Sequence, residues 1–397
     1  MLPMKKIGIY LASNQKSGGI FQYNINFIKA LNDLNFYFDV YYVYTDQIWE
    51  EYIPKNCKFF FLKKNIIEVL IFFLLKNFFL KKIIYFIILF LNKKFKFNLL
   101  SLKKKNNFLD KLKCEYFIFP SQDVISYKIK TKSIVAVHDL MHLFHPYLFE
   151  YRNGECELRT LHYNLIAKNS YRILVDSKFG KKHVLTKLKS SKTEQVKILP
   201  FCPTTYLHAK KNINVFKKYK IPKNYIFYPA HFWEHKNHEI LVKAINISKQ
   251  SGFIFNCVFV GGVKNNFNNI LNLVKNLDLE DQFYFLGYVE EQDMYSLYKN
   301  ALATTYVSIL GPTNIPPLEA MFSGSPLLYS NVYAMKEQMR YAGIAINPYN
   351  AKQISNYLIK ISTNRLFRKK MIQLGFKRIK EINYLNFRKK IYQILKQ

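Results

Sequence analysis

The sequence predicts an α/β protein built from two doubly wound domains, each a parallel sheet covered by helices. Apolar runs of strand length alternate with amphipathic runs of helix length, which is typical of repeated βαβ units. The alternation is interrupted at residues 201–223 and then starts again. A chain of 397 residues is also too long for one ordinary core, so two domains are expected.

The first half of the chain, residues 1–200, supplies the first expected sheet. Its apolar runs end in polar turns, and helical stretches such as 20–34 and 178–189 separate them. The expected strands are 5–12, 38–45, 116–120, 133–139, 172–177 and 196–200.

The second half, residues 224–397, repeats the pattern. Segment 201–223 carries proline and many basic and polar residues, so we expect it to be the linker. Ligands of such sheets bind outside the carboxyl ends of the strands, so we expect the two domains to face a central cleft. The expected strands are 224–230, 256–262, 282–289, 301–308 and 325–330.

The composition is strongly basic, with 60 Lys and Arg against 26 Asp and Glu and a net charge of +34. Nucleic acid, anionic lipid or anionic metabolites could each be the partner, although an AT-rich genome would also enrich Lys, Asn, Ile, Phe and Tyr. The five cysteines form no CxxC pair, which suits a reducing cytoplasm better than a disulfide framework or a zinc site. The first residues lack the pattern of a signal peptide, so a cytoplasmic location is expected.

Segment 66–97 is almost entirely apolar and basic. Lys76, Lys81 and Lys82 divide it into runs shorter than the roughly 20 residues that a membrane-spanning helix needs. The pattern favours a pair of amphipathic helices lying on an anionic membrane surface, which would make the protein peripheral on the inner membrane. The alternative is a long helix in the core of the first domain.

Two turns of the first domain place polar groups at strand ends. Gly18 and Gly19 open a helix, where backbone N–H groups can meet a phosphate or a sugar hydroxyl, although a plain tight turn would also explain them. His138 and Asp139 follow an apolar strand and could contact a polar ligand. Nearby histidines do not have the spacing of a zinc-binding helix, so no metal site is expected.

Two turns of the second domain also carry polar groups. Lys236 lies among three histidines (His231, His235 and His238) at the start of a helix, where an anion such as a diphosphate is favoured, unless this is only a solvated helix start. Further on, the turn 311–314 precedes a helix with proline in its first turn. Glu319 in that helix could accept hydrogen bonds from adjacent hydroxyls, as on a ribose.

Taken together, these segments resemble retaining glycosyltransferases of family 4. The resemblance rests on the glycine turn at 18–19, "HD" at 138–139, "ILVDS" at 173–177, "HKNH" at 235–238 and "IPPLEAMFSGSPLL" at 315–328. It implies the GT-B fold, with a Rossmann-like acceptor-binding domain over 1–200 and a Rossmann-like nucleotide-sugar-binding domain over 224–397. It also implies transfer from a nucleotide diphosphate sugar, without metal or other cofactor, to a lipid-linked or oligosaccharide acceptor in O-antigen, lipopolysaccharide or capsule assembly.

The resemblance also assigns roles to residues of the second domain. Glu319 resembles the second glutamate of the Glu-x7-Glu motif, which holds the ribose, but the first glutamate falls at Gly311. Thr313 and Asn314 are expected to take over its contacts to the donor sugar. Lys236 matches the lysine on the diphosphate, and the usual arginine falls at His231.

Catalysis is expected to depend on stabilising the charge that develops on the β-phosphate. Lys236, the amides of Gly18 and Gly19 and the helix start beyond Pro312 could do this, and no side chain stands out as a nucleophile. His138 matches the family histidine near the transferred sugar, and Asp139 follows it.

Three other functions stay open at this point. A nucleotide-sugar epimerase of the same fold would also place histidine and glutamate at the site. A nucleic-acid-binding protein would explain the charge, but no nucleic-acid-binding signature occurs and no nucleic-acid partner is expected. An inactive scaffold would explain Gly311 and His231.

Overall fold

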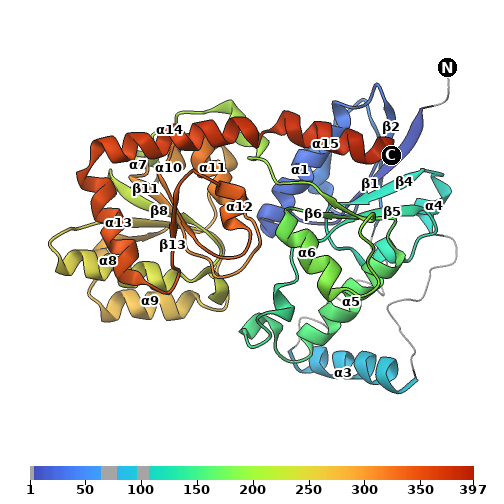
Figure 1. The fold of residues 1–397 in the computed structure, drawn as a ribbon, viewed down its shortest axis with the longest axis horizontal. Coiled ribbons are helices and arrows are strands. Elements are labelled where there is room, and N and C mark those ends of the chain that lie inside the picture. Colours follow the sequence, from blue (N-terminus) through green and yellow to red (C-terminus); the bar gives the residue numbers. More distant parts are fainter. Residues whose placement is uncertain (1–3, 64–77, 96–106) are drawn as a thin grey trace. The chain divides into compact units, whose positions relative to one another are not determined.

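The computed structural model describes residues 4–63, 78–95 and 107–397, which fold into two compact units. The first unit contains residues up to Leu199 together with Arg388–Gln397, and the second contains Pro200–Phe387. In each unit a parallel sheet is covered by helices (Figure 1). The predicted fold class, two Rossmann-like α/β domains, is therefore confirmed.

The sheet of the first unit has the strand order β3-β2-β1-β4-β5-β6-β7 in the described part of the chain. All of its neighbouring strands pair in parallel. The strands are β1 (Lys5–Leu11), β2 (Phe38–Tyr44), β3 (Lys58–Phe61), β4 (Tyr116–Phe119), β5 (Lys132–Ala136), β6 (Arg172–Val175) and β7 (Val196–Ile198).

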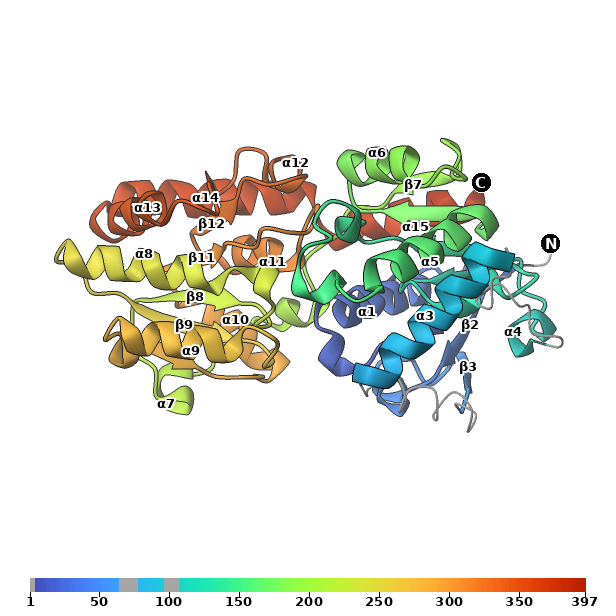
Figure 2. The same cartoon turned by 90° about the horizontal axis from the view of Figure 1, so that it is seen from below.

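The α-helices described in the first unit follow the strands in the usual α/β manner, except for a long one inserted after β3. They are α1 (Gly19–Asn32), α3 (Phe78–Phe95), α4 (Phe108–Lys111), α5 (Glu155–Asn169), α6 (Lys178–Lys187) and the larger part of α15 (Tyr384–Lys396). Short 3-10 helices are η1 (Gln15–Ser17), η2 (Gln47–Glu51), η4 (Val124–Tyr127), η5 (Met141–Leu143) and η6 (Phe149–Tyr151). The inserted helix α3 contacts α5 and lies along its outer side (Figure 2).

The sheet of the second unit has the order β10-β9-β8-β11-β12-β13 and is again parallel. Phe227, Leu241, Phe259 and Leu318 are among the fully buried residues of its core. The strands are β8 (Tyr225–Pro229), β9 (Asn256–Val260), β10 (Phe283–Phe285), β11 (Ala303–Tyr306), β12 (Leu327–Ser330) and β13 (Ile344–Ile346).

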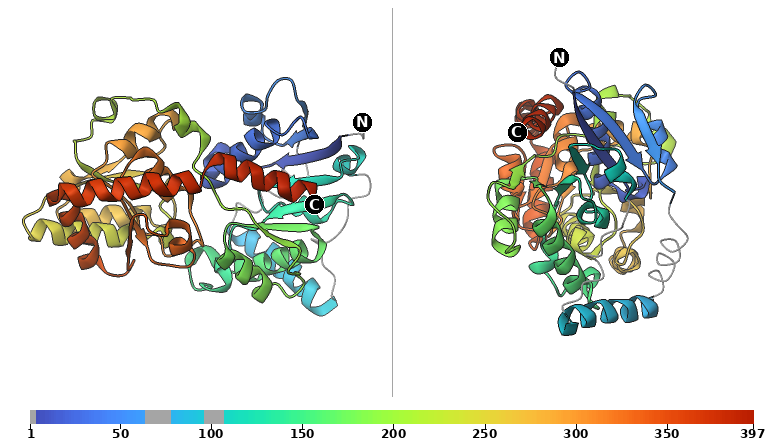
Figure 3. Two further views of the ribbon diagram at one scale, coloured as in Figure 1. Left: turned by 45° about the horizontal axis from the view of Figure 1, so that its top comes forward. Right: turned by 90° about the vertical axis from the view of Figure 1, so that its right-hand side faces the viewer.

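Helices of the second unit complete its βαβ repeats. The α-helices are α7 (Val215–Tyr219), α8 (His238–Gln250), α9 (Phe267–Asn276), α10 (Glu291–Lys299), α11 (Ile315–Ser323), α12 (Met335–Met339), α13 (Ala351–Thr363) and α14 (Arg365–Glu381). The 3-10 helices are η7 (Thr205–Ala209), η8 (Glu234–Lys236) and η9 (Glu280–Gln282). Helix α15 follows directly after α14 (Figure 3).

Two predicted boundaries differ from the structure. Residues 201–223, expected as a linker, fold with the second unit, because Leu207 and Val215 are buried in it and η7 and α7 form there. Residues 388–397, expected in the second domain, belong to the first unit. Arg172 at the start of β6 secures this segment there by donating a hydrogen bond to the backbone oxygen of Ile394 at 2.9 Å.

The predicted membrane segment 66–97 is described only over α3. Residues 66–77 and 96–97 lie outside the described residues. None of the helices described here combines the length and the apolar character needed to cross a bilayer.

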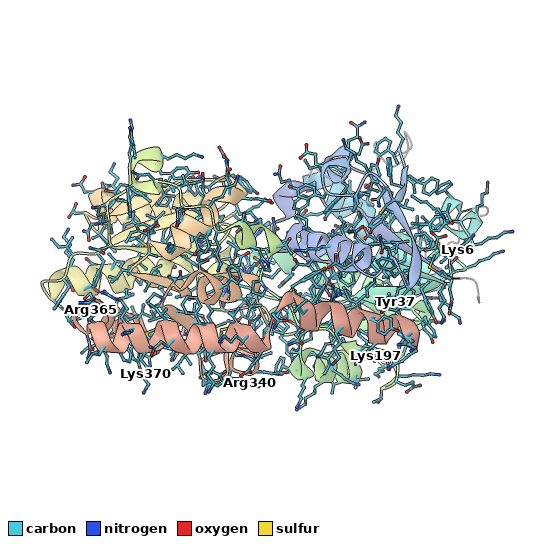
Figure 4. The ribbon with its side chains drawn as sticks, turned by 90° about the horizontal axis from the view of Figure 1, so that it is seen from above. Lys6, Tyr37, Lys197, Arg340, Arg365 and Lys370 are labelled. Atoms are coloured by element: carbon cyan, nitrogen blue, oxygen red, sulfur yellow. The ribbon has the colours of Figure 1, made fainter. Side chains whose placement is uncertain are left out.

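The positive charge is distributed over several elements. Lys6 and Lys197 lie on strands of the first unit, whereas Arg365 and Lys370 lie on α14 and Arg340 follows α12 (Figure 4). These cations therefore do not follow a single helix, as they would in a helix that enters a nucleic-acid groove.

Candidate functional site

The strand order of the second sheet reverses at β8. Strands β9 and β10 extend from one side of β8, and β11, β12 and β13 extend from the other. In open parallel sheets the ligand site lies at such a switch point, outside the carboxyl ends of the two central strands. The turns that follow β8 and β11, residues 230–237 and 307–314, contain most of the site residues predicted for the second domain.

A chain of hydrogen bonds joins these two turns through Tyr306, the last residue of β11. Lys236 Nζ donates to the Tyr306 hydroxyl at 2.9 Å and lies 5.3 Å from the centre of its ring. The same hydroxyl donates to Asn314 Oδ1 at 2.8 Å. The structure thus brings Lys236 and Asn314, which were predicted separately, onto one tyrosine.

The ammonium group of Lys236 has no carboxylate partner among the described residues. Its hydrogen-bond acceptor is neutral and its side chain is half-buried. A cation in this position attracts an anion, because its charge is not neutralised and it is less well hydrated than on an open surface.

The backbone around Lys236 is fixed by hydrogen bonds to neighbouring turns. Asn237 has a left-handed backbone, with φ of 57°, and its amide donates to the carbonyl oxygens of Val307 at 3.3 Å and Pro348 at 2.7 Å. The N–H of Ile309 donates to the carbonyl oxygen of His235 at 2.9 Å. These contacts fix the backbone on both sides of Lys236.

Asn314 is held equally firmly. Its backbone N–H donates to Gln338 Oε1 at 3.0 Å, and Gln338 Nε2 donates back to its carbonyl oxygen at 2.8 Å. It is the N-cap residue of α11, and two prolines occupy the first turn of that helix, as the sequence predicted. Gly311 begins this turn with φ of 98°, and Thr313 is buried.

His231 is neutral and accepts a hydrogen bond. The N–H of Gly262 donates to its Nδ1 at 2.8 Å, so this nitrogen carries no proton. Burial, together with the charges of Lys264 and Lys236, lowers the pKa of His231 to about 4. His231 therefore does not supply the positive charge that an arginine would bring to this position.

His238 does not belong to the anion site, although it was grouped with the neighbouring histidines. Its side chain is fully buried, and its ring stacks on Phe232 at 4.3 Å between ring centres. Burial lowers its pKa to about 3, so the ring is neutral and belongs to the core beneath the turn.

Glu319 is turned into the protein. Its Oε1 accepts hydrogen bonds from Thr204 Oγ1 at 2.5 Å and from the Tyr206 hydroxyl at 3.0 Å, and its Oε2 accepts one from the Tyr298 hydroxyl at 2.7 Å. The side chain is buried, and burial raises its pKa. The carboxylate that was expected to contact a ribose therefore already accepts three internal hydrogen bonds.

The first sheet has its own switch point, between β1 and β4. Gly18, with φ of 59°, follows η1 and caps α1, and Gly19 begins that helix. The turn after β1 therefore contains a short 3-10 helix that the sequence did not predict. Both glycines lie at the carboxyl edge of the sheet, where a ligand of this unit is expected.

His138 and Asp139 lie at the same edge, after β5. His138 Nε2 lies 2.9 Å from the carbonyl oxygen of Pro120, which can only accept, so Nε2 carries the proton. The ring of His138 packs edge-on against Tyr23 of α1 at 5.1 Å, and burial lowers its pKa. Asp139 Oδ1 accepts from the N–H of Met141 at 2.9 Å and holds the turn.

The two histidines that follow do not gather around His138. His142 is buried and stacks on Tyr163 at 5.3 Å, whereas His145 Nδ1 lies 2.7 Å from the Tyr147 hydroxyl.

Several residues of these arrangements were not predicted. Tyr306 lies near the end of the predicted strand 301–308, so its place at the carboxyl edge could have been noticed. No sequence pattern around the other residues marks them, because each contacts its partner only in the folded chain. These residues are Tyr298, Thr204, Tyr206 and Gln338.

The two-domain architecture is that of the GT-B glycosyltransferases. Sucrose-phosphate synthase from Thermosynechococcus elongatus superposes with a TM-score of 0.73 at 15% identity, covering 99% of this chain and 98% of that one. Anabaena HepE in complex with UDP-glucose gives 0.72 at 13% identity, with 98% and 99% covered. WaaG, a glycosyltransferase of lipopolysaccharide biosynthesis, gives 0.66 at 12% identity, with 98% and 99% covered.

Residues 211–378 match the family model of glycosyl transferases group 1. O-antigen chain mannosyltransferase RfbU of Salmonella typhimurium is 25% identical over 222 residues, which is 55% of this chain and 57% of the relative. O-antigen chain mannosyltransferase B of Escherichia coli is 25% identical over 174 residues, 43% of this chain and 46% of the relative. The matched stretches thus span about half the length of these two relatives.

Proposed function

We propose that the protein is a retaining glycosyltransferase that moves a hexose from a nucleotide diphosphate sugar to a growing cell-surface polysaccharide or a lipid-linked glycan. The observation that carries the proposal is the unneutralised ammonium group of Lys236, held by Tyr306 at the switch point of a group 1 domain. Mannose is the first donor sugar to test, because two relatives are O-antigen chain mannosyltransferases.

The proposed role of Lys236 follows from the charge that the reaction creates. When the bond between the anomeric carbon and the β-phosphate oxygen breaks, its electron pair stays on the nucleoside diphosphate. A fixed cation at that oxygen stabilises the transition state more than the ground state, which raises the rate. Asn314 and the backbone of 311–313 would bind the sugar and the phosphates beside it.

The first unit would bind the acceptor. Gly18, Gly19, His138 and Asp139 lie at the carboxyl edge of its sheet, where that ligand is expected. His138, with its proton on Nε2, would contact the transferred sugar as a neutral group. A lipid-linked acceptor would bring the enzyme to the inner face of the membrane as a peripheral protein.

Glu319 keeps a place in the proposal only if one of its oxygens also reaches the ribose. A carboxylate has about four acceptor positions, and three are occupied by internal donors. The ribose contact and the internal network can therefore coexist.

A nucleotide-sugar screen tests the function. Purified protein is heated with GDP-mannose, UDP-glucose or the free nucleoside diphosphates, and the unfolding temperature is recorded. A donor at 100 times its Kd should add about 2.7 kcal/mol of stability. The proposal fails if no nucleotide sugar stabilises the protein.

A turnover assay then separates the two enzyme classes. A glycosyltransferase should release the nucleoside diphosphate in proportion to the acceptor supplied, and the product should keep the anomeric configuration of the donor. An epimerase would instead interconvert nucleotide sugars without acceptor and release no nucleoside diphosphate.

A further inference from the structure

Helix α3 exposes a row of apolar side chains. Leu80, Ile83, Phe86, Ile87 and Phe90 follow one another at spacings of three, three, one and three residues, which places them on one face of the helix. Phe86 is 69% exposed, and the other four are between 38% and 46% exposed. We call these five residues the α3 stripe. Contiguous exposed apolar residues of this kind mark an interaction surface more often than scattered ones do.

The opposite face of α3 is held by the first unit. Tyr85 is buried, and its hydroxyl donates to Glu155 Oε2, at the start of α5, over 3.0 Å. A Cβ at Gly154 would lie 3.5 Å from Leu89 Cδ1 and 3.7 Å from Tyr85 Cβ, so the helix packs directly on this turn. The described part of the segment is therefore not a core helix, and the stripe cannot turn inward without breaking these contacts.

The stripe itself is preorganised. The rings of Phe86 and Phe90 stack at 6.0 Å between centres with an interplanar angle of 21°. Because the helix is already formed and anchored, a partner would meet an ordered apolar surface and would not have to order it.

The surrounding sequence determines the sign of the partner's charge. Between Glu68 and Asp110 the chain contains no acidic residue and nine lysines. Lys82 on α3 itself is exposed. The lysines are Lys76, Lys81, Lys82, Lys93, Lys94, Lys96, Lys103, Lys104 and Lys105. Apolar residues flanked only by cations suit an interface between acyl chains and anionic headgroups.

The area of the α3 stripe is too small for a stable protein–protein interface. Eleven helical residues, 80–90, span roughly 16 Å, and with a helix width of about 10 Å they present on the order of 160 Å². A stable protein–protein interface buries about 800 Å² on each partner. A bilayer has no such lower limit, because it receives each apolar side chain separately.

We propose that the α3 stripe docks the protein onto an anionic lipid bilayer, with α3 lying in the interface and not crossing it. The proposal is independent of the transfer reaction, because it requires neither donor nor acceptor. It also specifies which part of the predicted segment 66–97 carries the contact, namely the side of α3 that faces away from α5.

Flotation with vesicles tests this docking surface on the full chain. Vesicles of phosphatidylcholine alone, and of phosphatidylcholine with 30% phosphatidylglycerol, are compared by the fraction of protein that floats. The wild type should float with the anionic vesicles, and high salt should reduce that fraction. A wild type that stays at the bottom with both vesicle types overturns the proposal.

A variant with Ile83→Gln, Phe86→Gln, Ile87→Gln and Phe90→Gln removes the apolar groups and keeps good helix formers. It should keep the wild-type circular dichroism and lose membrane partitioning by about tenfold or more. The control, Ile254→Gln with Leu366→Gln, changes two side chains that are 72% and 80% exposed in the second unit and should float normally.

Two further outcomes would overturn the proposal. One is a quadruple variant that floats like the wild type. The other is a wild type that is dimeric in light scattering while the variant is monomeric, because the stripe would then bind a second copy of the chain. If the quadruple variant does not fold, Phe86→Gln alone, at the most exposed position, replaces it with the same expected direction.

Discussion

The hydroxyl of Tyr298 donates a hydrogen bond to Glu319 Oε2 over 2.7 Å, and both side chains are buried. Tyr298 belongs to α10 and Glu319 to α11. Thr204 and Tyr206 bring the segment after Pro200 to the other oxygen of the same carboxylate. Glu319 therefore joins three segments of the second unit, which is a structural role that its motif did not suggest.

We predict that Glu319→Ala destabilises the second unit, whatever its effect on ligands. The substitution leaves the buried hydroxyls of Thr204 and Tyr298 and the half-buried hydroxyl of Tyr206 without their acceptor, and each unsatisfied buried group costs about 1–3 kcal/mol. The expected loss in the free energy of unfolding is at least about 3 kcal/mol in a urea titration. Tyr298→Phe, which removes one donor and keeps the ring, should cost only about 1 kcal/mol.

Nucleotide binding separates the two roles of this glutamate. If Glu319→Ala is as stable as the wild type but binds the nucleotide about tenfold to a hundredfold more weakly, the ribose contact is its main role and the network is secondary. If stability falls and the folded fraction binds the nucleotide normally, the ribose role is wrong.

We predict that Lys236→Met lowers kcat by about a hundredfold or more, because removing one donor to a developing negative charge has effects of that size. KM for the donor should change less, since the contact strengthens in the transition state. Tyr306→Phe removes the hydroxyl that Lys236 contacts but keeps the ring beneath its charge, so it should lower kcat less. An unchanged kcat in Lys236→Met would exclude this lysine from the mechanism.

A strand could be predicted from the sequence where all of its successive residues are buried. Tyr225–Pro229 is a fully buried parallel strand, and such strands appear in the sequence as unbroken apolar runs between turns. Strand β3 (Lys58–Phe61) was missed because it is a short, largely exposed edge strand. Strand β13 (Ile344–Ile346), at the edge of the other sheet, is only three residues long.

The site was predictable only where it follows the strands. Lys236 and Asn314 belong to turns after predicted strands, so their place at one edge of the sheet follows from the parallel topology. The partners of Glu319 are 21 to 115 residues away from it in the sequence, and nothing local marks them. A buried carboxylate with three donors and a carboxylate open to a ligand have the same sequence signature.

We predict that Gly311→Glu does not restore the family's Glu-x7-Glu motif as a binding device. Gly311 has φ of 98°, where a side chain is strained by about 1–2 kcal/mol. A Cβ there would also lie 3.1 Å from the amide of Asn314, which holds Tyr306. The variant should be less stable and should gain no affinity for nucleotide sugars in thermal-shift titrations.

Gly252→Ala is the matched control for the stability lost when a side chain is added at a glycine with positive φ. Gly252 has φ of 82°, and no atom lies within 4 Å of a Cβ placed there. Gly252→Ala should lose only the stability that the strained backbone costs, and it should bind nucleotide sugars like the wild type. Tighter donor binding by Gly311→Glu would show instead that the turn can accept the missing glutamate.

We predict that the free energy of unfolding of the second unit decreases as the pH is lowered, and that His238 contributes to this decrease. Its pKa is about 3 in the folded protein, against 6.5 for an ordinary histidine, because it is buried. The unfolded chain therefore binds a proton between these pH values and the folded chain does not, so this contribution is complete above pH 6.5 and is lost as the pH falls toward 3. The expected slope is about 1.4 kcal/mol per pH unit for this one histidine.

Urea titrations of the second unit's transition at pH 7, 6 and 5 should show a shallower slope for His238→Phe, which keeps an aromatic ring against Phe232. Phe232→Leu disturbs the same packing without removing a titrating group, so it should lower stability equally at every pH. An unchanged slope in His238→Phe would mean that this ring does not resist protonation in the folded state.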